Sequence, residues 1–232
     1  MSFNKILDKD VKQIRNFLVD LVEDTKNQYA QTFGIVKSAK FDGIDEILAN
    51  DKKINDKQNN FTKMALWKIV KQKMVASDLR LAVGGIIISR EIKKTAHVAK
   101  RICKNLKIAS TENYLPNFEK DYEYFQYVVK MFEIANTILN LTGNLIENFV
   151  EDQHKKVLIM EKSMKYEIRE IMNGISLSKN KVNTVDSAGF LLIIRQLKDL
   201  EKAAESLLQI EETLQFIRTG SFEELDIYKE EK

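Results

Sequence analysis

The feature that most constrains the fold is a helical repeat of apolar residues that very little interrupts. Only one Pro and 8 Gly occur in 232 residues, and these two residue types break helices most strongly. Apolar side chains recur three or four positions apart, which places them on one face of an α-helix. Six such stripes run through residues 11–21, 44–69, 88–106, 118–146, 157–171 and 194–217. Because the alternation typical of strands is missing, we expect an all-α protein with six long helices.

Turn signals separate these stripes. They are Gly34, Gly43, the polar stretch 109–117 with Pro116, Gly174 with the polar residues 176–183, and Gly220. The turn between the fourth and fifth helices is expected near residues 149–154. Helices with one apolar face bury it most economically in a bundle. We therefore expect two tandem, spectrin-like three-helix bundles, 1–112 and 113–220, followed by an acidic tail at 221–232.

The two halves also resemble each other in sequence, which suggests an internal repeat with pseudo-two-fold symmetry. A shift of 108 positions, from Asp78 to Asp186, aligns several residues without a gap: Glu91 with Asp199, Ile92 with Leu200, Lys94 with Lys202, Ala96 with Ala204 and Ile102 with Ile210. Any two amphipathic helices match at several positions, so chance similarity stays open as the alternative.

Composition restricts the partners and the compartment. The 37 basic and 34 acidic groups give a net charge of +3, too close to balance to suggest nucleic-acid binding. Cys103 has no partner for an internal disulfide. The longest apolar run, 81–88, is far shorter than the roughly 20 residues that cross a bilayer, and the N-terminus lacks the apolar core of a signal peptide. We expect a cytoplasmic protein with no transmembrane segment.

Three stretches resemble the signatures of the PhoU family, whose members are accessory regulators of phosphate uptake. They are "VASDLR" at 75–80, "VAKRIC" at 98–103 and "LKDLEKAAESLLQIEETLQFIRTG" at 197–220. The resemblance implies a fold of two three-helix bundles. It also implies a regulator without enzymatic activity that contacts the ATPase of a phosphate ABC transporter, and in some bacteria a sensor histidine kinase, to restrain phosphate import. Self-association into a homodimer or a larger homo-oligomer is implied too, as is peripheral attachment to the inner face of the membrane through the transporter.

The same resemblance implies metal sites. Family members hold metal clusters with Glu/Asp-x-x-x-Asp pairs on the second and third helices of each bundle. Residues i and i+4 share a helix face, and their oxygen ligands suit hard cations such as Mg, Mn or Fe. In the second bundle Glu161, Glu201 and Glu205 match this pattern, but Lys165 stands where a fourth acid belongs. We expect at most one hard divalent or iron cation at this site, called site two below.

The corresponding site one, in the first bundle, departs further from the family pattern. Asp51 matches, Asn55 is a neutral substitute, Lys93 replaces Glu, and His97 replaces Asp. A lysine ammonium about 4 Å from a divalent ion would repel it by several kcal/mol, even at an effective dielectric constant of about 20. We expect that metal binding is lost at site one and that Lys93 pairs with Asp51 instead. An ordinary solvated helix face at residues 90–97 is the alternative.

Other functions find less support in the residues. A helical adaptor that has lost both metals and phosphate regulation is the alternative reading of the function. A ferritin-like oxidase needs Glu-x-x-His motifs, and His97 has Lys94 three positions before it. His97 and His154 are the only histidines, which argues against zinc. Cys103 lies on an apolar stripe and is expected in the core, and Gly84 and Gly85 are expected to allow close helix packing. We assign no catalytic or cofactor-binding residue.

Overall fold

A computed structural model describes residues 2–38, 43–111, 122–179 and 187–221, and every regular element in these ranges is an α-helix. The helices are α1 (Ser2–Ser38), α2 (Ile44–Gln72), α3 (Ala76–Thr111), α4 (Tyr122–Glu147), α5 (Glu151–Lys179) and α6 (Ser187–Thr219). The expected all-α fold with six long helices is confirmed. No helix in the described part of the chain carries an apolar stretch long enough to span a bilayer.

Three of the six expected turns are confirmed, and the one expected at 109–117 lies mostly outside the described residues. Gly43 precedes α2 with φ 86° and Gly220 follows α6 with φ 82°, a conformation that suits glycine. The turn between α4 and α5 lies close to the expected residues. Gly34 and Gly174 were wrongly predicted to mark turns, because they lie inside α1 and α5. One glycine costs a helix only about 1 kcal/mol, which tertiary packing on both sides readily offsets.

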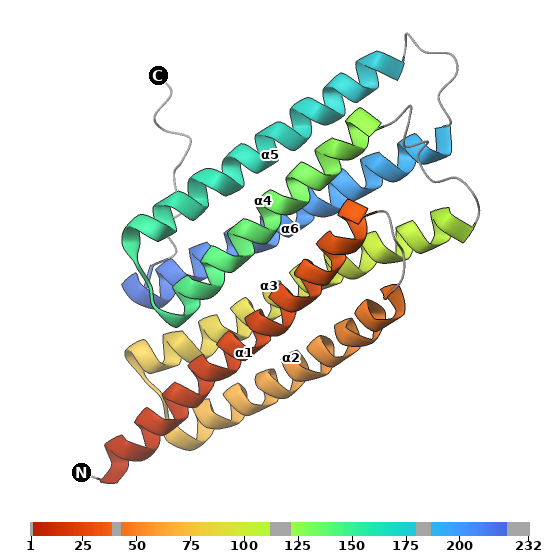
Figure 1. Ribbon diagram of the computed structural model, residues 1–232. Coiled ribbons are helices and arrows are strands. Elements are labelled where there is room, and N and C mark those ends of the chain that lie inside the picture. The colour runs from red at the N-terminus through yellow and green to blue at the C-terminus, as the bar shows by residue number, and fades with distance from the viewer. Residues whose placement is uncertain (1, 39–42, 112–121, 180–186, 222–232) are drawn as a thin grey trace, which may run out of the picture.

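The helices form two three-helix groups that share one core. Helices α1, α2 and α3 pack against one another, and so do α4, α5 and α6. The two bundles meet through α3 against α6 and α1 against α4, while α2 and α5 lie at opposite edges of the molecule (Figure 1). The buried apolar side chains of both bundles belong to a single cluster. The predicted boundary after residue 112 lies outside the described residues, as does nearly all of the predicted tail.

Glycines lie at both contacts between the bundles. A Cβ atom on Gly84 of α3 would lie 2.6 Å from Cγ1 of Ile217 on α6. A Cβ atom on Gly143 of α4 would lie 2.8 Å from Cγ1 of Val22 on α1. Both distances are shorter than any normal carbon–carbon contact, so these glycines let the helices approach closely. The expectation that Gly84 serves helix packing is confirmed.

Candidate functional site: the basic cleft and the two carboxylate sites

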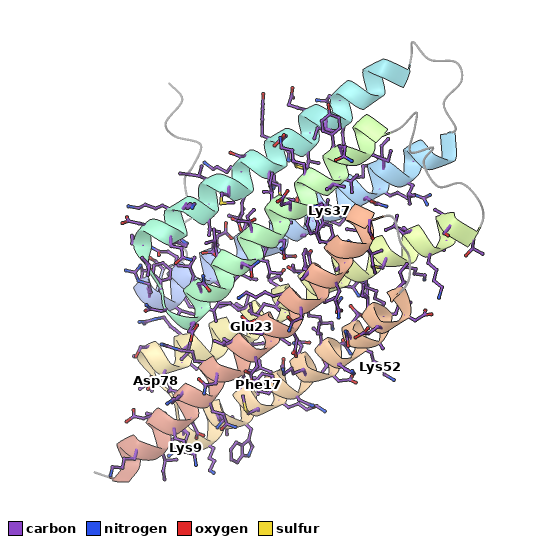
Figure 2. The ribbon with its side chains drawn as sticks, in the orientation of Figure 1. Lys9, Phe17, Glu23, Lys37, Lys52 and Asp78 are labelled. Atoms are coloured by element: carbon purple, nitrogen blue, oxygen red, sulfur yellow. The ribbon has the colours of Figure 1, made fainter. Side chains whose placement is uncertain are left out.

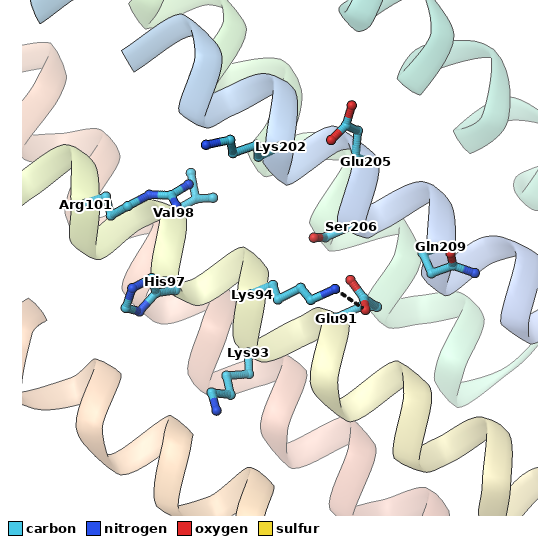
Figure 3. Close-up of a pocket in the computed structure, with 10 residues that line it drawn as sticks. All are labelled: Glu91, Lys93, Lys94, His97, Val98, Arg101, Lys202, Glu205, Ser206 and Gln209. Atoms are coloured by element: carbon cyan, nitrogen blue, oxygen red, sulfur yellow. Dashed lines mark hydrogen bonds and ion pairs between the residues drawn. The ribbon is translucent and has the colours of Figure 1, made fainter. Parts of the chain in front are cut away.

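A cleft of about 550 Å³ lies between α3 and α6, where the two bundles meet. It contains most of the charged residues that follow the apolar middle of α3. Its lining residues are Glu91, Lys93, Lys94, His97, Val98, Arg101, Lys202, Glu205, Ser206 and Gln209 (Figure 3). Four permanent cations therefore face two carboxylates and one histidine, so the cleft is predominantly basic.

Two of these cations already have acidic partners. Lys94 donates to Glu91 one helical turn before it, at 2.7 Å. Arg101 of α3 pairs with Asp199 of α6 at 2.9 Å, so this ion pair joins the bundles. Burial raises the pKa of Asp199, and Arg101 partly counteracts that rise. By contrast, Lys93 and Lys202 make no ion pair with another described residue. They give the cleft its unbalanced positive charge.

Site one is built around Asp51, whose side chain α2 presents toward α3. Asp51 is only 7% exposed. Its two carboxylate oxygens lie 2.6 Å from Nζ of Lys100 and 3.2 Å from Nδ1 of His97. The prediction that Lys93 pairs with Asp51 is wrong, because the ammonium that reaches Asp51 comes from two turns further along α3. Asn55 lies one turn on from Asp51 and bonds its neighbour Asp56 instead.

We expect Lys100→Met to destabilise the fold, whereas Lys93→Met leaves stability nearly unchanged. Breaking a fully buried pair costs about 3–5 kcal/mol. The Lys100 side chain is 31% exposed, so the expected loss is smaller, about 1–2 kcal/mol. Urea unfolding of both variants beside the parent protein measures the difference. Equal losses for Lys93→Met and Lys100→Met would contradict this description of site one.

Site two is divided between two locations. On the surface, Glu201 pairs with Arg169 at 3.4 Å and Glu205 pairs with Lys165 at 3.6 Å, so basic residues of α5 face the acids of α6. Glu161 is instead completely buried, and neither of its carboxylate oxygens has a hydrogen-bond partner among the described residues. The three carboxylates predicted for this site are therefore not gathered around a common point.

Neither site, as it stands, presents a set of free carboxylates. In the described ranges no group of three or more His, Cys, Asp or Glu side chains is placed to hold one metal ion. A metal cluster needs several negative oxygens that point at it. Asp51 at site one, and Glu201 and Glu205 at site two, already contact Lys, Arg or His side chains. Ion pairs thus stand at the positions where the family resemblance implies metal ligands.

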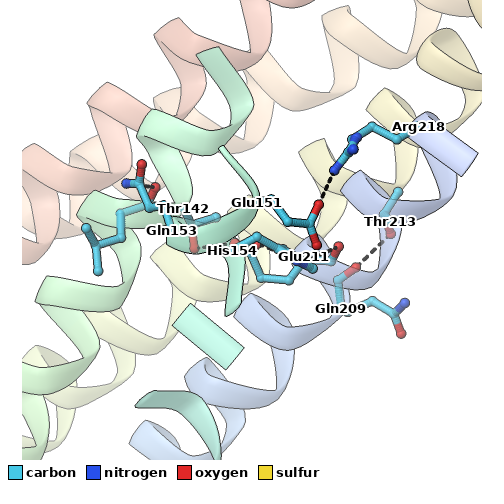
Figure 4. Close-up of polar contacts among 9 residues, drawn as sticks. Thr142, Glu151, Gln153, His154, Gln209, Glu211, Thr213 and Arg218 are labelled. Atoms are coloured by element: carbon cyan, nitrogen blue, oxygen red, sulfur yellow. Dashed lines mark hydrogen bonds and ion pairs between the residues drawn. The ribbon is translucent and has the colours of Figure 1, made fainter. Parts of the chain in front are cut away.

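Glu161 lies near a buried polar network that the sequence analysis missed. Burial, followed by the negative charge of Glu211, raises the pKa of Glu161 well above its usual range. Burial also raises the pKa of Glu211 to about 8, although Thr142 of α4 donates to it at 2.8 Å. Burial lowers the pKa of His154 of α5, and its ring donates to the Glu211 carbonyl at 3.3 Å (Figure 4). The network joins all three helices of the second bundle.

A signal for this network does exist in the sequence. Glu211 lies on the apolar stripe of α6, four positions after Leu207 and three before Leu214. His154 and Glu161 share the apolar stripe of α5 in the same way. The spacing of the apolar residues would therefore have indicated that these three polar side chains are buried.

Cys103 offers no reactive thiol. It is completely buried, its Sγ lies 3.6 Å from Oγ1 of Thr32, and burial raises its pKa to about 11. A nucleophilic cysteine needs an exposed thiol with a lowered pKa. The expectation that Cys103 belongs to the core is confirmed.

Comparison with known proteins identifies other proteins with this fold. The family model described as "PhoU domain" matches residues 18–106. The crystal structure of PhoU from Pseudomonas aeruginosa has a TM-score of 0.81 at 15% identity and covers 92% of this chain and 99% of its own. That of the phosphate transport system regulatory protein PhoU from Streptococcus pneumoniae has a TM-score of 0.82 at 14% identity and covers 94% and 100%. No curated protein matches the sequence. Residues 18–106 therefore match the PhoU domain model, and the chain has the fold of these PhoU proteins over nearly its whole length.

Proposed function

We propose that the chain regulates phosphate uptake by binding the ATPase subunit of a phosphate ABC transporter and restraining import. The observation that carries this proposal is the PhoU domain match together with a PhoU fold that covers more than nine-tenths of the chain. The S. pneumoniae protein of the same fold is named as a regulator of a phosphate transport system. The role is a protein contact rather than catalysis, and its place is the cytoplasmic side of the membrane, where the ATPase lies.

The basic cleft is a suitable contact surface for this partner. Lys93 and Lys202 lie on its two walls, α3 and α6, and neither is neutralised by a described carboxylate. Unpaired surface cations steer an acidic partner toward the site and fix its orientation. The contact would then span both bundles, so their relative position would influence binding.

The test is a binding measurement between the purified chain and the purified ATPase subunit of the phosphate transporter of the same organism. We expect saturable, salt-sensitive binding that the double variant Lys93→Ala/Lys202→Ala weakens about ten-fold or more. The matched control is Lys52→Ala/Lys53→Ala, two exposed lysines on α2. Absence of binding, or equal binding to an unrelated transporter ATPase, would support the alternative, a helical adaptor without a phosphate-related role.

A sensor histidine kinase as a second partner and a homodimer are finer parts of the same proposal. The kinase is tested by the same binding assay with its cytoplasmic portion. Light scattering tests the dimer, and a monomeric mass at tens of micromolar would remove that part of the proposal.

We also propose that site two takes at most one weakly held hard cation, through Glu201 and Glu205. Replacing Lys165 by Glu removes the cation beside Glu205 and adds an oxygen ligand, so metal affinity should rise. Site one should hold no metal, with Asp51 engaged by Lys100 and His97. Metal analysis after incubation with Mn²⁺ or Fe²⁺ checks both statements. A multinuclear cluster in the unmodified protein would contradict them.

A further inference from the structure

Exposed apolar side chains gather at one end of the first bundle. Eleven large apolar residues are exposed in the described part of the chain. Five of them, Ile6, Leu66, Trp67, Val70 and Val75, come from the start of α1, the last two turns of α2 and the turn before α3. We call these five residues the apolar tip. The other six are spread along α3, α5, α6 and the turn before α5.

The apolar tip is a local departure from an otherwise polar helix face. Exposed positions of α2 from Asp45 to Lys63 are polar except for Ala49, and then Leu66, Trp67 and Val70 follow on the same face. Trp67 is 56% exposed and Val70 is 77% exposed. Exposing this much apolar surface on adjacent turns is unfavourable in water unless something covers it.

The packing of α1 against α2 brings Ile6 and Val75 to the same end. Asp10 of α1 accepts hydrogen bonds from Lys68 and Gln72 of α2. Ile6 lies one turn before Asp10, beyond the end of α2, and Val75 lies in the turn to α3. In Figure 1 the N-terminal end of α1 and the α2–α3 turn lie at the same end of the molecule. The apolar tip therefore lies at one end of the first bundle.

Lysines surround the apolar tip. Lys5, Lys9, Lys63, Lys71 and Lys73 are all exposed, and Figure 2 shows Lys9 near the N-terminal end of α1. The only exposed carboxylate within residues 5–9 and 63–75 is Asp8. The Lys71 ammonium lies 4.3 Å from the centre of the Trp67 ring, so cationic and apolar groups form one surface.

We propose that the apolar tip, with its ring of lysines, binds the surface of an anionic lipid bilayer. Exposed apolar side chains at the end of a bundle can enter the boundary between headgroups and acyl chains, where an indole ring is especially stable. The flanking lysines then lie at the depth of the lipid phosphates, each adding about five-fold to the affinity. The tip residues line neither the basic cleft between α3 and α6 nor the smaller cleft between α2 and α3. This inference stands apart from the proposed ATPase contact, which uses α3 and α6.

Trp67 is the only tryptophan in the chain, so its fluorescence reports on the tip alone. We expect its emission to shift to shorter wavelength when the purified protein meets vesicles of phosphatidylglycerol and phosphatidylcholine. Vesicles of phosphatidylcholine alone should produce no shift, and raised salt should weaken the effect, because the lysines act through screened electrostatics. Co-sedimentation with the same vesicles gives the partition coefficient.

Matched variants distinguish binding through the apolar tip from nonspecific adsorption of the protein to vesicles. Leu66→Ser/Val70→Ser keeps the reporter and should lower partitioning about ten-fold. Lys63→Gln/Lys71→Gln should lower it about 25-fold. Controls are Ile159→Ser, an exposed apolar residue on α5, and Lys52→Gln/Lys53→Gln on the polar part of α2. Neither control should change partitioning.

Three results would overturn the proposal. The first is no spectral shift with anionic vesicles. The second is a shift that both vesicle compositions produce equally. The third is a shift that grows with protein concentration without lipid, since the tip would then be a contact between copies of the chain. Because the assay contains no ATPase, its failure would leave the proposed regulatory function untouched.

Discussion

Replacing Asp10 by Ala should lower the free energy of unfolding by about 3–5 kcal/mol. Lys68, the partner of Asp10, is only 3% exposed, and its ammonium lies between α1 and α2. Gln13 is its other hydrogen-bond partner, at 2.8 Å, and carries no charge. Burial by itself would raise the pKa of Asp10, but hydrogen bonds from Lys68 and Gln72 hold it below its usual value. The variant therefore leaves a buried cation without a counter-charge.

Two comparisons identify the cause of that loss. Asp24→Ala removes the partner of Lys57 at a partly exposed pair between the same helices, where less than about 1 kcal/mol is expected. The double variant Asp10→Ala/Lys68→Met removes both buried charges and should recover most of the lost stability. Urea unfolding measures all three. A double variant as unstable as Asp10→Ala would mean that packing, not the unpaired ammonium, sets the cost.

Replacing Glu211 by Gln should make the decline in stability between pH 6.5 and 8 less steep. The folded carboxyl keeps its proton up to about pH 8, whereas the unfolded one loses it near its ordinary value of 4.5. Folding thus takes up a proton in this window, so stability falls as pH rises. The neutral amide of Gln abolishes this uptake and can still accept the hydrogen bond from Thr142. At pH 8 the variant should be more stable than its parent by on the order of 3–5 kcal/mol.

The neighbours of Glu211 determine where this effect is clearest. Thr142 of α4 carries no charge. Glu161 of α5, whose pKa is also raised, makes stability fall further as pH rises. His154 of α5 has the opposite effect, because its pKa is lowered. Because the pKa of folded His154 is lowered, stability falls as pH drops below about 6.5, the ordinary histidine value. The window above pH 6.5 is therefore the cleanest. Glu133→Gln, on the exposed face of α4, is the control, and parallel pH profiles for Glu211→Gln and the parent would contradict the prediction.

The fold could be predicted because its signal is repeated along the whole chain. Six apolar stripes and a few breakers indicated the helices, and the order of the helices indicated two bundles. Gly34 and Gly174 misled the prediction because a single glycine weakens a long helix without ending it. The way the bundles meet, α3 against α6, depends on close contacts at Gly84 that no periodicity reveals.

The candidate sites show where sequence spacing stops being informative. Positions 51 and 97 do face each other, as the family pattern implied. The spacing could not tell which lysine of α3 reaches Asp51, because Lys93 and Lys100 lie seven residues apart, almost on the same line along the helix. The relative position of α2 and α3 along their axes determines that Lys100, rather than Lys93, pairs with Asp51. At site two, the rotation of α5 turns Glu161 into the core and Lys165 toward Glu205.

The central claim is that this chain restrains phosphate import, and the rate of labelled phosphate uptake tests it most directly. Uptake is measured in cells that contain the chain and in cells that lack it. It is also measured in cells that lack the native chain but produce either the wild type or the Lys93→Ala/Lys202→Ala variant. The account predicts faster uptake without the chain, restored restraint with the wild type, and incomplete restraint with the cleft variant at equal protein level. An uptake rate that stays the same whether the chain is present or absent would contradict the claim.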